Sequence, residues 1–171
     1  MKSFLLVVFG GALRISEALG LERRHVDLNT GRIRVEQQLI PGRLRTIGTT
    51  KNGETRTVML GPSALAAANT YAKRHRAFGQ NNPFFVNERG EHLTKNAIYK
   101  KWYVIREQAG LPHARIHDLR HASLTELAQV GGTMAEVMAF GGHKDHRSAQ
   151  RYQHASDERM EALVALRREA V

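Results

Sequence analysis

The sequence predicts a mainly α-helical fold (α+β) with one small, three-stranded antiparallel β-sheet. Apolar residues recur at helical spacing along most of the 171-residue chain, and glycine or proline marks the ends of these stretches. The period changes to that of a half-buried strand near residues 32–60. Hydrophobic residues make up 42% of the chain, which is enough for the core of one domain.

Residues 3–20 are predicted to form two short helices that separate at a pair of glycines. In the second helix, Arg14 and Glu17 lie three residues apart and therefore project from one polar face. The other face is expected to reach the core through its apolar residues, which are Ile15, Ala18 and Leu19.

The predicted sheet begins with a strand in which Ile33 and Val35 alternate with charged residues. A second strand is expected near residues 44–47, after a Pro-Gly turn. The Asn-Gly pair that follows Lys51 is favoured in tight hairpins, so it predicts a turn before a third strand near residues 55–60. Lys51 is therefore expected at a hairpin turn.

Helical spacing returns after the sheet and continues to the end of the chain. Thr94 is predicted to cap one of these helices, and Thr133 with Glu136 forms the capping box that opens another. The expected helices are residues 63–78 with Gly79 as the C-cap, 95–109, 117–130, a short helix that ends at Gly141-Gly142, 147–154 and 156–169.

The charge of the chain is strongly positive, with 26 Lys and Arg against 16 Asp and Glu and a net charge of +10. This excess favours a polyanionic partner, with nucleic acid first and an anionic membrane surface second. The sequence has no apolar run near the roughly 18 residues that a membrane span needs. The absence of cysteine excludes a disulfide framework and a cysteine nucleophile, and it fits a cytoplasmic chain.

The segment His117-Asp118-Leu119-Arg120-His121 carries the most informative chemistry. His117 and Arg120 lie three residues apart, so they project together from a helix. A guanidinium offers a fixed fork of donors to two phosphate oxygens, and histidine exchanges a proton near neutral pH. The pair suits phosphate chemistry, although a single His-x-x-Arg is more often a solvated helix start.

A histidine zinc site is a second interpretation of the same residues. His117 and His121 have i, i+4 spacing, and His143 and His146 follow later in the chain. No glutamate lies between the first two histidines to serve as a general base, so the spacing departs from that of zinc hydrolases.

Five segments in a fixed order distinguish these interpretations. They are Leu13-Arg14-Ile15-Ser16-Glu17-Ala18-Leu19, then residues 50–58 with Lys51, residues 117–121, Gly142-His143, and Tyr152. Each segment is common alone, but the series resembles the catalytic domain of the tyrosine recombinase or phage integrase family. The resemblance extends from about residue 4 to residue 155. It implies the DNA breaking-rejoining fold of that family.

The resemblance also implies the reaction. Arg14 and Arg120 match the two arginines that hold the non-bridging oxygens of the scissile phosphate. Tyr152 matches the nucleophile, which forms a 3′-phosphotyrosyl intermediate with DNA, and His117 matches its candidate base. The intermediate keeps the energy of the broken bond, so rejoining needs no nucleotide cofactor. No metal is needed either, because the cations take its place.

The remaining matches are a general acid and its surroundings. Lys51 matches the acid that protonates the departing 5′ oxygen, and His143 matches a further hydrogen-bond donor to the phosphate. Glu17 and His121 match supporting residues, and Glu17 lies one turn from Arg14, where it would orient that guanidinium.

Family members usually carry an N-terminal helical domain that clamps DNA, and the sequence here begins at the catalytic domain. Residues 1–171 are therefore interpreted as a single catalytic domain without that clamp. The expected partner is double-stranded DNA, with self-association on DNA through a C-terminal helix near residues 157–168. No small-molecule substrate is expected, and the location is expected to be the cytoplasm, at the nucleoid, of a bacterium, or of the host of a phage that encodes the chain.

Three departures from the family pattern stand out. The stretch between Arg14 and Lys51 is longer than in compact members, and Gly141 stands where many members have leucine. The expected lack of the clamping domain is the third departure. Two other functions remain open at this point: a type IB topoisomerase-like relaxase with the same residues, and a DNA-binding module without catalysis.

Overall fold

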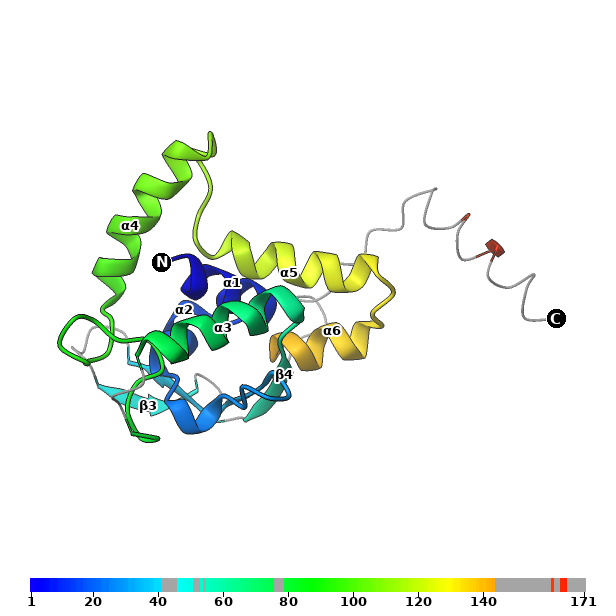
Figure 1. Cartoon of the computed structure of the whole chain (residues 1–171). Helices are drawn as coiled ribbons and strands as arrows, with labels where there is room; N and C mark the ends of the chain where they lie inside the picture. The colour runs from blue at the N-terminus through cyan, green and yellow to red at the C-terminus, as the bar shows by residue number, and fades with distance from the viewer. Residues whose placement is uncertain are drawn as a thin grey trace. The chain divides into compact units, whose positions relative to one another are not determined.

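The computed structural model describes residues 1–40, 46–50, 53, 55–75, 79–143, 161 and 164–165. It divides into two compact units, Met1–Ser123 and Leu124–Val171. The helices are α1 Lys2–Gly10, α2 Ile15–Gly20, a 3-10 turn η1 Arg23–His25, α3 Pro62–Arg74, α4 Lys95–Gln108, α5 Asp118–Gln129 and α6 Met134–Gly141 (Figure 1). The strands are β1 Arg32–Val35, β2 Gln37–Leu39, β3 Ile47–Thr49 and β4 Arg56–Met59. A mainly helical fold with small antiparallel sheets is confirmed.

The first two helices separate at Gly10 and Gly11, as their spacing predicts. Helix α1 packs closely against α3, because a Cβ atom on Gly10 would lie 2.5 Å from the Cβ of Ala64. Only glycine permits this approach. Burial of Ile15 and Leu19 confirms the predicted core face of α2.

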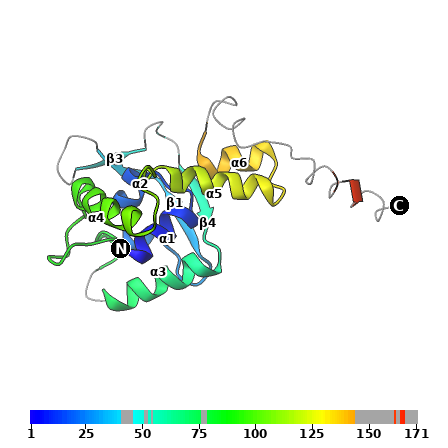
Figure 2. The ribbon, with the colours of Figure 1, turned by 90° about the horizontal axis from the view of Figure 1, so that it is seen from above.

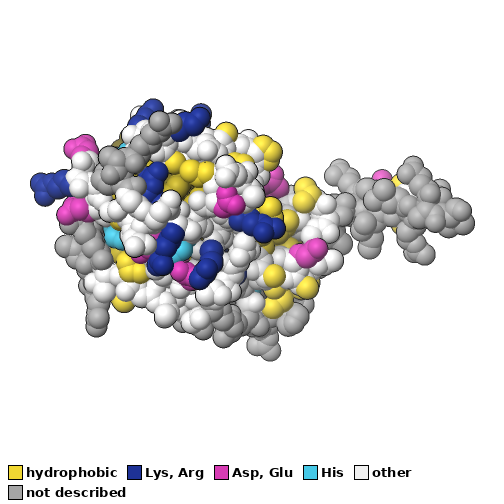
Figure 3. All heavy atoms as spheres, turned by 60° about the horizontal axis from the view of Figure 1, so that its bottom comes forward, with side chains coloured by type: hydrophobic (Ala, Val, Ile, Leu, Met, Phe, Trp, Pro, Cys, Tyr) yellow, Lys and Arg dark blue, Asp and Glu magenta, His cyan; other side chains and the backbone are white. Residues whose placement is uncertain are grey.

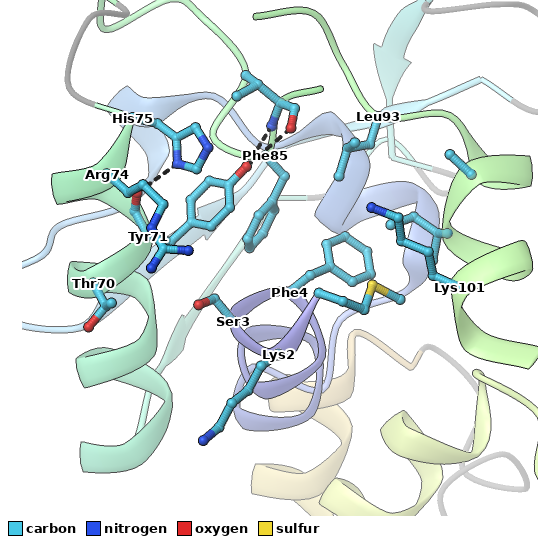
Figure 4. A pocket seen from close by; sticks show the side chains of 14 residues that line it. Lys2, Ser3, Phe4, Thr70, Tyr71, Arg74, His75, Phe85, Leu93 and Lys101 are labelled. Atoms are coloured by element: carbon cyan, nitrogen blue, oxygen red, sulfur yellow. Dashed lines mark hydrogen bonds between the residues drawn. The ribbon is translucent and has the colours of Figure 1, made fainter. Parts of the chain in front are cut away.

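An aromatic cluster fills the core beside the start of α1. The rings of Phe4 and Phe85 meet edge to face at 5.0 Å, and Phe84 contacts Phe85 in the same way at 4.9 Å. The Tyr71 hydroxyl bonds to the backbone N–H and C=O of Val86 at 3.0 and 3.2 Å. Figure 4 shows this contact at the wall of a pocket of about 310 Å³. The pocket is lined by the start of α1, the end of α3 and the first half of α4. Figure 2 shows the N-terminus between α3 and α4.

The strands pair differently from the prediction. In the described residues they form two separate two-stranded antiparallel ladders, β1 with β4 and β2 with β3, and the expected single three-stranded sheet is wrong. Only Glu36 separates β1 from β2 along the chain, whereas residues 50–55 separate their partners β3 and β4. The extra residues between β3 and β4 separate the two ladders.

The Asn-Gly turn therefore lies in the connection between β3 and β4, which do not pair with each other in the described ladders. The Gly53 N–H donates to the Thr50 carbonyl at 2.9 Å, and Gly53 has a φ of +69°. Gly53 is thus the fourth residue of this turn, a position where glycine is common. Lys51 itself lies outside the described residues.

Helix α3 ends at Arg74, earlier than the predicted end at residue 78. The cause is tertiary. The guanidinium of Arg23 donates to the backbone carbonyls of Ala72 and His75, at 3.4 and 2.9 Å, and the His75 ring stacks on Tyr71 at 4.1 Å. These contacts satisfy carbonyls that further helical turns would otherwise occupy.

The other predicted caps are confirmed. The Thr94 hydroxyl oxygen accepts the N–H of Ala97 at 3.2 Å at the start of α4, and Thr133 forms a capping box with Glu136. Gly142, with φ +63°, ends α6 in the left-handed conformation. The helices expected at 147–154 and 156–169 lie outside the described residues, apart from three positions. In the part of the chain that is described, no helix is long and apolar enough to cross a membrane.

Candidate active site

Arg14 occupies the residue before α2, where its backbone and side chain both bond to Glu17. Its N–H donates to Glu17 Oε2 at 2.8 Å, and its Nη1 donates to Glu17 Oε1 at 2.8 Å. Glu17 thus reaches back one turn and caps the helix. The Arg14 side chain is 26% exposed, whereas its carboxylate partner is 1% exposed. The guanidinium therefore has a buried anchor and an accessible edge.

A second arginine, Arg56 at the start of β4, binds the same carboxylate. Its Nη1 and Nη2 donate to Glu17 Oε1 and Oε2 at 2.9 and 2.7 Å, which is a two-point contact. Burial by itself raises the pKa of Glu17, but the hydrogen bonds and charges of Arg56 and Arg14 outweigh it and lower the pKa to about 2. Glu17 is therefore an anion at neutral pH.

Arg120, in the first turn of α5, is buried and bonds to the turn between α1 and α2. Its Nη1 donates to the Ala12 carbonyl at 2.5 Å. Ala12 has a φ of +44°, in the left-handed region that residues with a side chain rarely adopt. The carbonyl that this turn presents to Arg120 lies two residues before Arg14. The bond therefore brings the start of α5 to the Arg14 segment.

His117 directly precedes α5, and its carbonyl accepts the N–H of Arg120 at 3.1 Å. Its ring meets the ring of His121 edge to face, with centroids 4.7 Å apart. The ring reaches solvent, yet burial of its inner side is the largest cause that lowers the pKa of His117. The charges of His121, Arg120 and Arg14 lower it further, against the opposing effect of Asp118. The neutral ring is therefore favoured, and a neutral imidazole accepts a proton.

The structure thus brings five of the predicted residues into one place in the first unit: Arg14, Glu17, His117, Arg120 and His121. His143 belongs to the second unit, where it follows the Gly142 cap of α6. Lys51 and Tyr152 lie outside the described residues.

Arg56 is the residue that the sequence did not single out. It is the first residue of strand β4, in which exposed and buried side chains alternate, and an arginine in such a strand is usually solvated. Its partner lies 39 residues away, so no local spacing indicates the contact.

His117 and His121 also have the i, i+4 spacing of a zinc site. Within the described ranges, no group of three or more His, Asp or Glu side chains is placed to hold a metal ion. His146 lies outside these ranges, so the reaction without metal stays a prediction.

Two guanidiniums with buried acceptors, beside a neutral histidine, define a site suited to a phosphate group and to proton transfer at it. The sequence pattern of the Phage integrase family matches residues 1–159. The chain belongs to this family.

A similar relative is the putative prophage phiRv2 integrase of Mycobacterium tuberculosis. It is 32% identical over 169 residues, which cover 96% of this chain and 45% of that protein. The chain spans about half the length of the curated relatives that it matches, including the tyrosine recombinase XerC of Pelotomaculum thermopropionicum, of which 52% is covered.

Two solved structures establish the fold. The Tn1549 transposon integrase, in complex with a circular intermediate DNA, superimposes with a TM-score of 0.77 at 20% identity, covering 95% of this chain and 57% of that one. The catalytic domain of bacteriophage HP1 integrase gives a TM-score of 0.58 at 18% identity, covering 95% and 79%. The fold is therefore that of a tyrosine recombinase catalytic domain.

Proposed function

We propose that this chain is the catalytic domain of a site-specific DNA recombinase or integrase, which cleaves and rejoins double-stranded DNA through a 3′-phosphotyrosine at Tyr152. The observation that carries the proposal is the cluster of Arg14, Arg120 and His117. A hydrogen bond from Arg120 to the Ala12 carbonyl joins the start of α5 to the Arg14 segment. Each segment carries an arginine, and the lowered pKa of His117 favours its neutral ring. Family membership gives independent support.

Arg14 and Arg120 hold the scissile phosphate. When an oxygen nucleophile attacks phosphorus, negative charge grows on the non-bridging oxygens, and fixed cations that face those oxygens stabilise the transition state. Both guanidiniums are fixed before DNA arrives, Arg14 by Glu17 and Arg120 by the Ala12 carbonyl. Little reorganisation is then needed at the moment of reaction.

His117 receives the proton of Tyr152. A phenol keeps its proton at neutral pH, because its reference pKa is about 10. The lowered pKa of His117 keeps its ring neutral and able to accept that proton. His121, which contacts the His117 ring edge to face, restricts the orientation of the base.

Lys51 protonates the departing 5′ oxygen, and His143 donates a hydrogen bond to the phosphate. Lysine is protonated at neutral pH and has a proton to give. Lys51 belongs to the connection between β3 and β4, in which the Gly53 N–H donates to the Thr50 carbonyl. Both assignments rest on the family pattern.

Double-stranded DNA is the proposed partner. The net charge of +10 favours a polyanion, and the Tn1549 integrase, which shares this fold, was solved with DNA. On the face drawn in Figure 3, Lys and Arg side chains lie at several places, with Asp and Glu side chains among them. Self-association through residues 157–168 and a location in the cytoplasm at the nucleoid stay predictions.

Capture of a covalent adduct tests the proposed function. A pool of nicked duplexes, randomised around the scissile phosphate and labelled upstream of it, is incubated with the chain in EDTA. Cleavage releases the short fragment between the scissile phosphate and the nick, which leaves with its 5′ hydroxyl and diffuses away, so a 3′-linked adduct accumulates on a denaturing gel. We expect an adduct in EDTA. Cleavage that needs added zinc or magnesium would instead support the metal site, and binding without any adduct would support the non-catalytic DNA-binding module.

A second step separates a recombinase from a topoisomerase-like relaxase. Duplexes whose 5′-hydroxyl ends either match or do not match the released fragment are supplied to the captured adduct, which shows whether the chain joins a strand from another molecule and whether the end sequence matters. Joining at sequence-defined ends is expected of a recombinase. Relaxation of supercoiled plasmid without such joining would favour the relaxase.

A further inference from the structure

The Glu17 carboxylate is shared by two arginines that come from different parts of the fold. Arg14 supplies a backbone N–H and Nη1 from the start of α2, and Arg56 supplies Nη1 and Nη2 from the start of β4. Each carboxylate oxygen thus accepts one bond from each arginine, at distances from 2.7 to 2.9 Å. The plane of the carboxylate is therefore fixed from both sides.

This sharing changes the charge that Arg14 offers to a ligand. Alone with Arg14, the Glu17 anion would neutralise that guanidinium. With Arg56 present, one negative charge is divided between two positive charges, so the cluster keeps a net positive charge. Because the Arg56 side chain is only 11% exposed and Glu17 only 1%, water screens this balance weakly.

The position of Arg56 in the chain gives it a second connection. It is the first residue of β4, it pairs with Val35 in the β1–β4 ladder, and it directly follows the connection of residues 50–55 that contains Lys51. Its bonds to Glu17 join the end of this connection to the Arg14 segment. The family pattern assigns parts to Arg14 and Lys51, and Arg56 is a physical link between their segments.

We propose that Arg56 is a positioning residue, which acts through Glu17 to orient the Arg14 guanidinium toward the scissile phosphate and to keep it positively charged. This inference rests on the proposed function, because it assigns Arg56 to the same site. Arg56 itself does not bind the reacting atoms in this scheme.

The first test is the rate of adduct formation by Arg56→Met, with Arg34→Met as the matched control. Arg34 lies on the partner strand β1 and bonds to a carboxylate, that of Glu36 at 2.5 Å, but its side chain is 68% exposed. Loss of correct positioning costs up to about 100-fold in rate, so we expect Arg56→Met to be slower by about 10- to 100-fold. Arg34→Met should stay within about threefold of wild type. Equal rates for Arg56→Met and wild type would overturn the proposal.

A double substitution separates positioning from general damage to the fold. If Arg56 acts only through Arg14, then Arg56→Met added to Arg14→Ala should slow the reaction by less than about threefold, because the group that it positions is already gone. A full additional loss in this background would show that Arg56 acts by another route, and the proposal would fail.

The pH dependence provides a readout that structural damage does not move. Arg56 is the strongest of the causes that lower the pKa of Glu17, and the others are Arg14 contacts. In Arg56→Met the pKa of Glu17 should rise, and the rate relative to Arg34→Met should fall further as the pH is lowered from 7 to 5. Arg56→Lys keeps the positive charge but loses the two-point contact. Its pH dependence should therefore return closer to that of wild type than its rate does. A rate ratio that is independent of pH would contradict the proposal.

NMR of the chain without DNA keeps this test independent of activity. Carbon-13 titration of the Glu17 carboxyl should show a higher pKa in Arg56→Met, and the Arg14 Nε–H signal should broaden through added motion. If wild type forms no adduct but these changes occur, the proposed function fails while the linkage of Arg56 to Arg14 stands. If wild type forms the adduct and neither signal changes, Arg56 does not position Arg14.

Discussion

His117 shows how a single residue is prepared for proton transfer by its neighbours. Burial of the inner side of the His117 ring and the charges of His121, Arg120 and Arg14 each disfavour the imidazolium form. Burial is the largest of the causes that lower the pKa of His117, and the cations that would bind a phosphate lower it further. Binding and base strength are coupled through electrostatics at this site.

We predict that the pKa of His117 in the folded chain lies below the usual value of 6.5. As the pH falls, the unfolded chain therefore binds this proton before the folded chain does. The free energy of unfolding should therefore fall as the pH drops below 6.5, and adduct formation should fall as the pH passes through the lowered pKa. A proton NMR titration of the His117 ring measures this value. Arg14→Met should raise it, since Arg14 is one of the causes. A wild-type midpoint at or above 6.5 would contradict the account of the base.

At the scale of elements, the crossing of α1 and α3 depends on two small residues. We predict that Gly10→Ala destabilises the chain by about 1–3 kcal/mol, because the added methyl would lie 2.5 Å from the Ala64 side chain. Ala64→Gly in the same chain should recover part of this loss. Urea unfolding measures all of these variants. Equal stability of Gly10→Ala and wild type would contradict this account of the α1–α3 contact.

The connection between β3 and β4 carries the proposed general acid. We predict that Lys51→Ala cleaves ordinary DNA very slowly but recovers strongly when sulfur replaces the bridging 5′ oxygen. An alkoxide needs a proton to leave, whereas a thiolate departs unaided. Arg14→Ala and Arg120→Ala should not recover to the same degree, because they act on the non-bridging oxygens. If all three variants respond alike in single-turnover cleavage, Lys51 only binds phosphate.

The elements also show which parts of the site are visible in a sequence. The contact of Arg14 with Glu17 follows from i, i+3 spacing, and the helix caps at Thr94 and Thr133 follow from local chemistry. The contact of Arg120 with the Ala12 carbonyl joins residues 108 positions apart, so no local rule predicts it.

The errors of the sequence prediction have the same origin. The end of α3 is set by Arg23, and the strand pairing is set by the residues inserted between β3 and β4. Spacing identifies the chemical groups, and the tertiary fold decides which of them meet. The family pattern assigns roles to Arg14 and Arg120, whereas it contains Arg56 in the segment 50–58 without a role for it.

At the scale of the whole molecule, the net charge of +10 dominates the expected interaction with DNA. We predict that affinity is mainly electrostatic for these 171 residues. If about six phosphates are contacted, a plot of log affinity against log salt concentration should have a slope near −5. Fluorescence anisotropy with duplexes of several sequences measures the slope. Tight binding to a single sequence that does not change with salt would contradict the prediction.

The site of the covalent bond to DNA tests the central claim most directly. Adduct formed with the randomised nicked pool is digested with nuclease and protease, and mass spectrometry locates the modified residue. The account predicts one modified residue, Tyr152, bonded to a 3′ phosphate. Tyr152→Phe should form no adduct while it binds DNA as wild type does, and Tyr103→Phe, which removes a 49% exposed tyrosine on α4, should form adduct normally. Adduct on another residue, a 5′ linkage, or normal adduct from Tyr152→Phe would contradict the account.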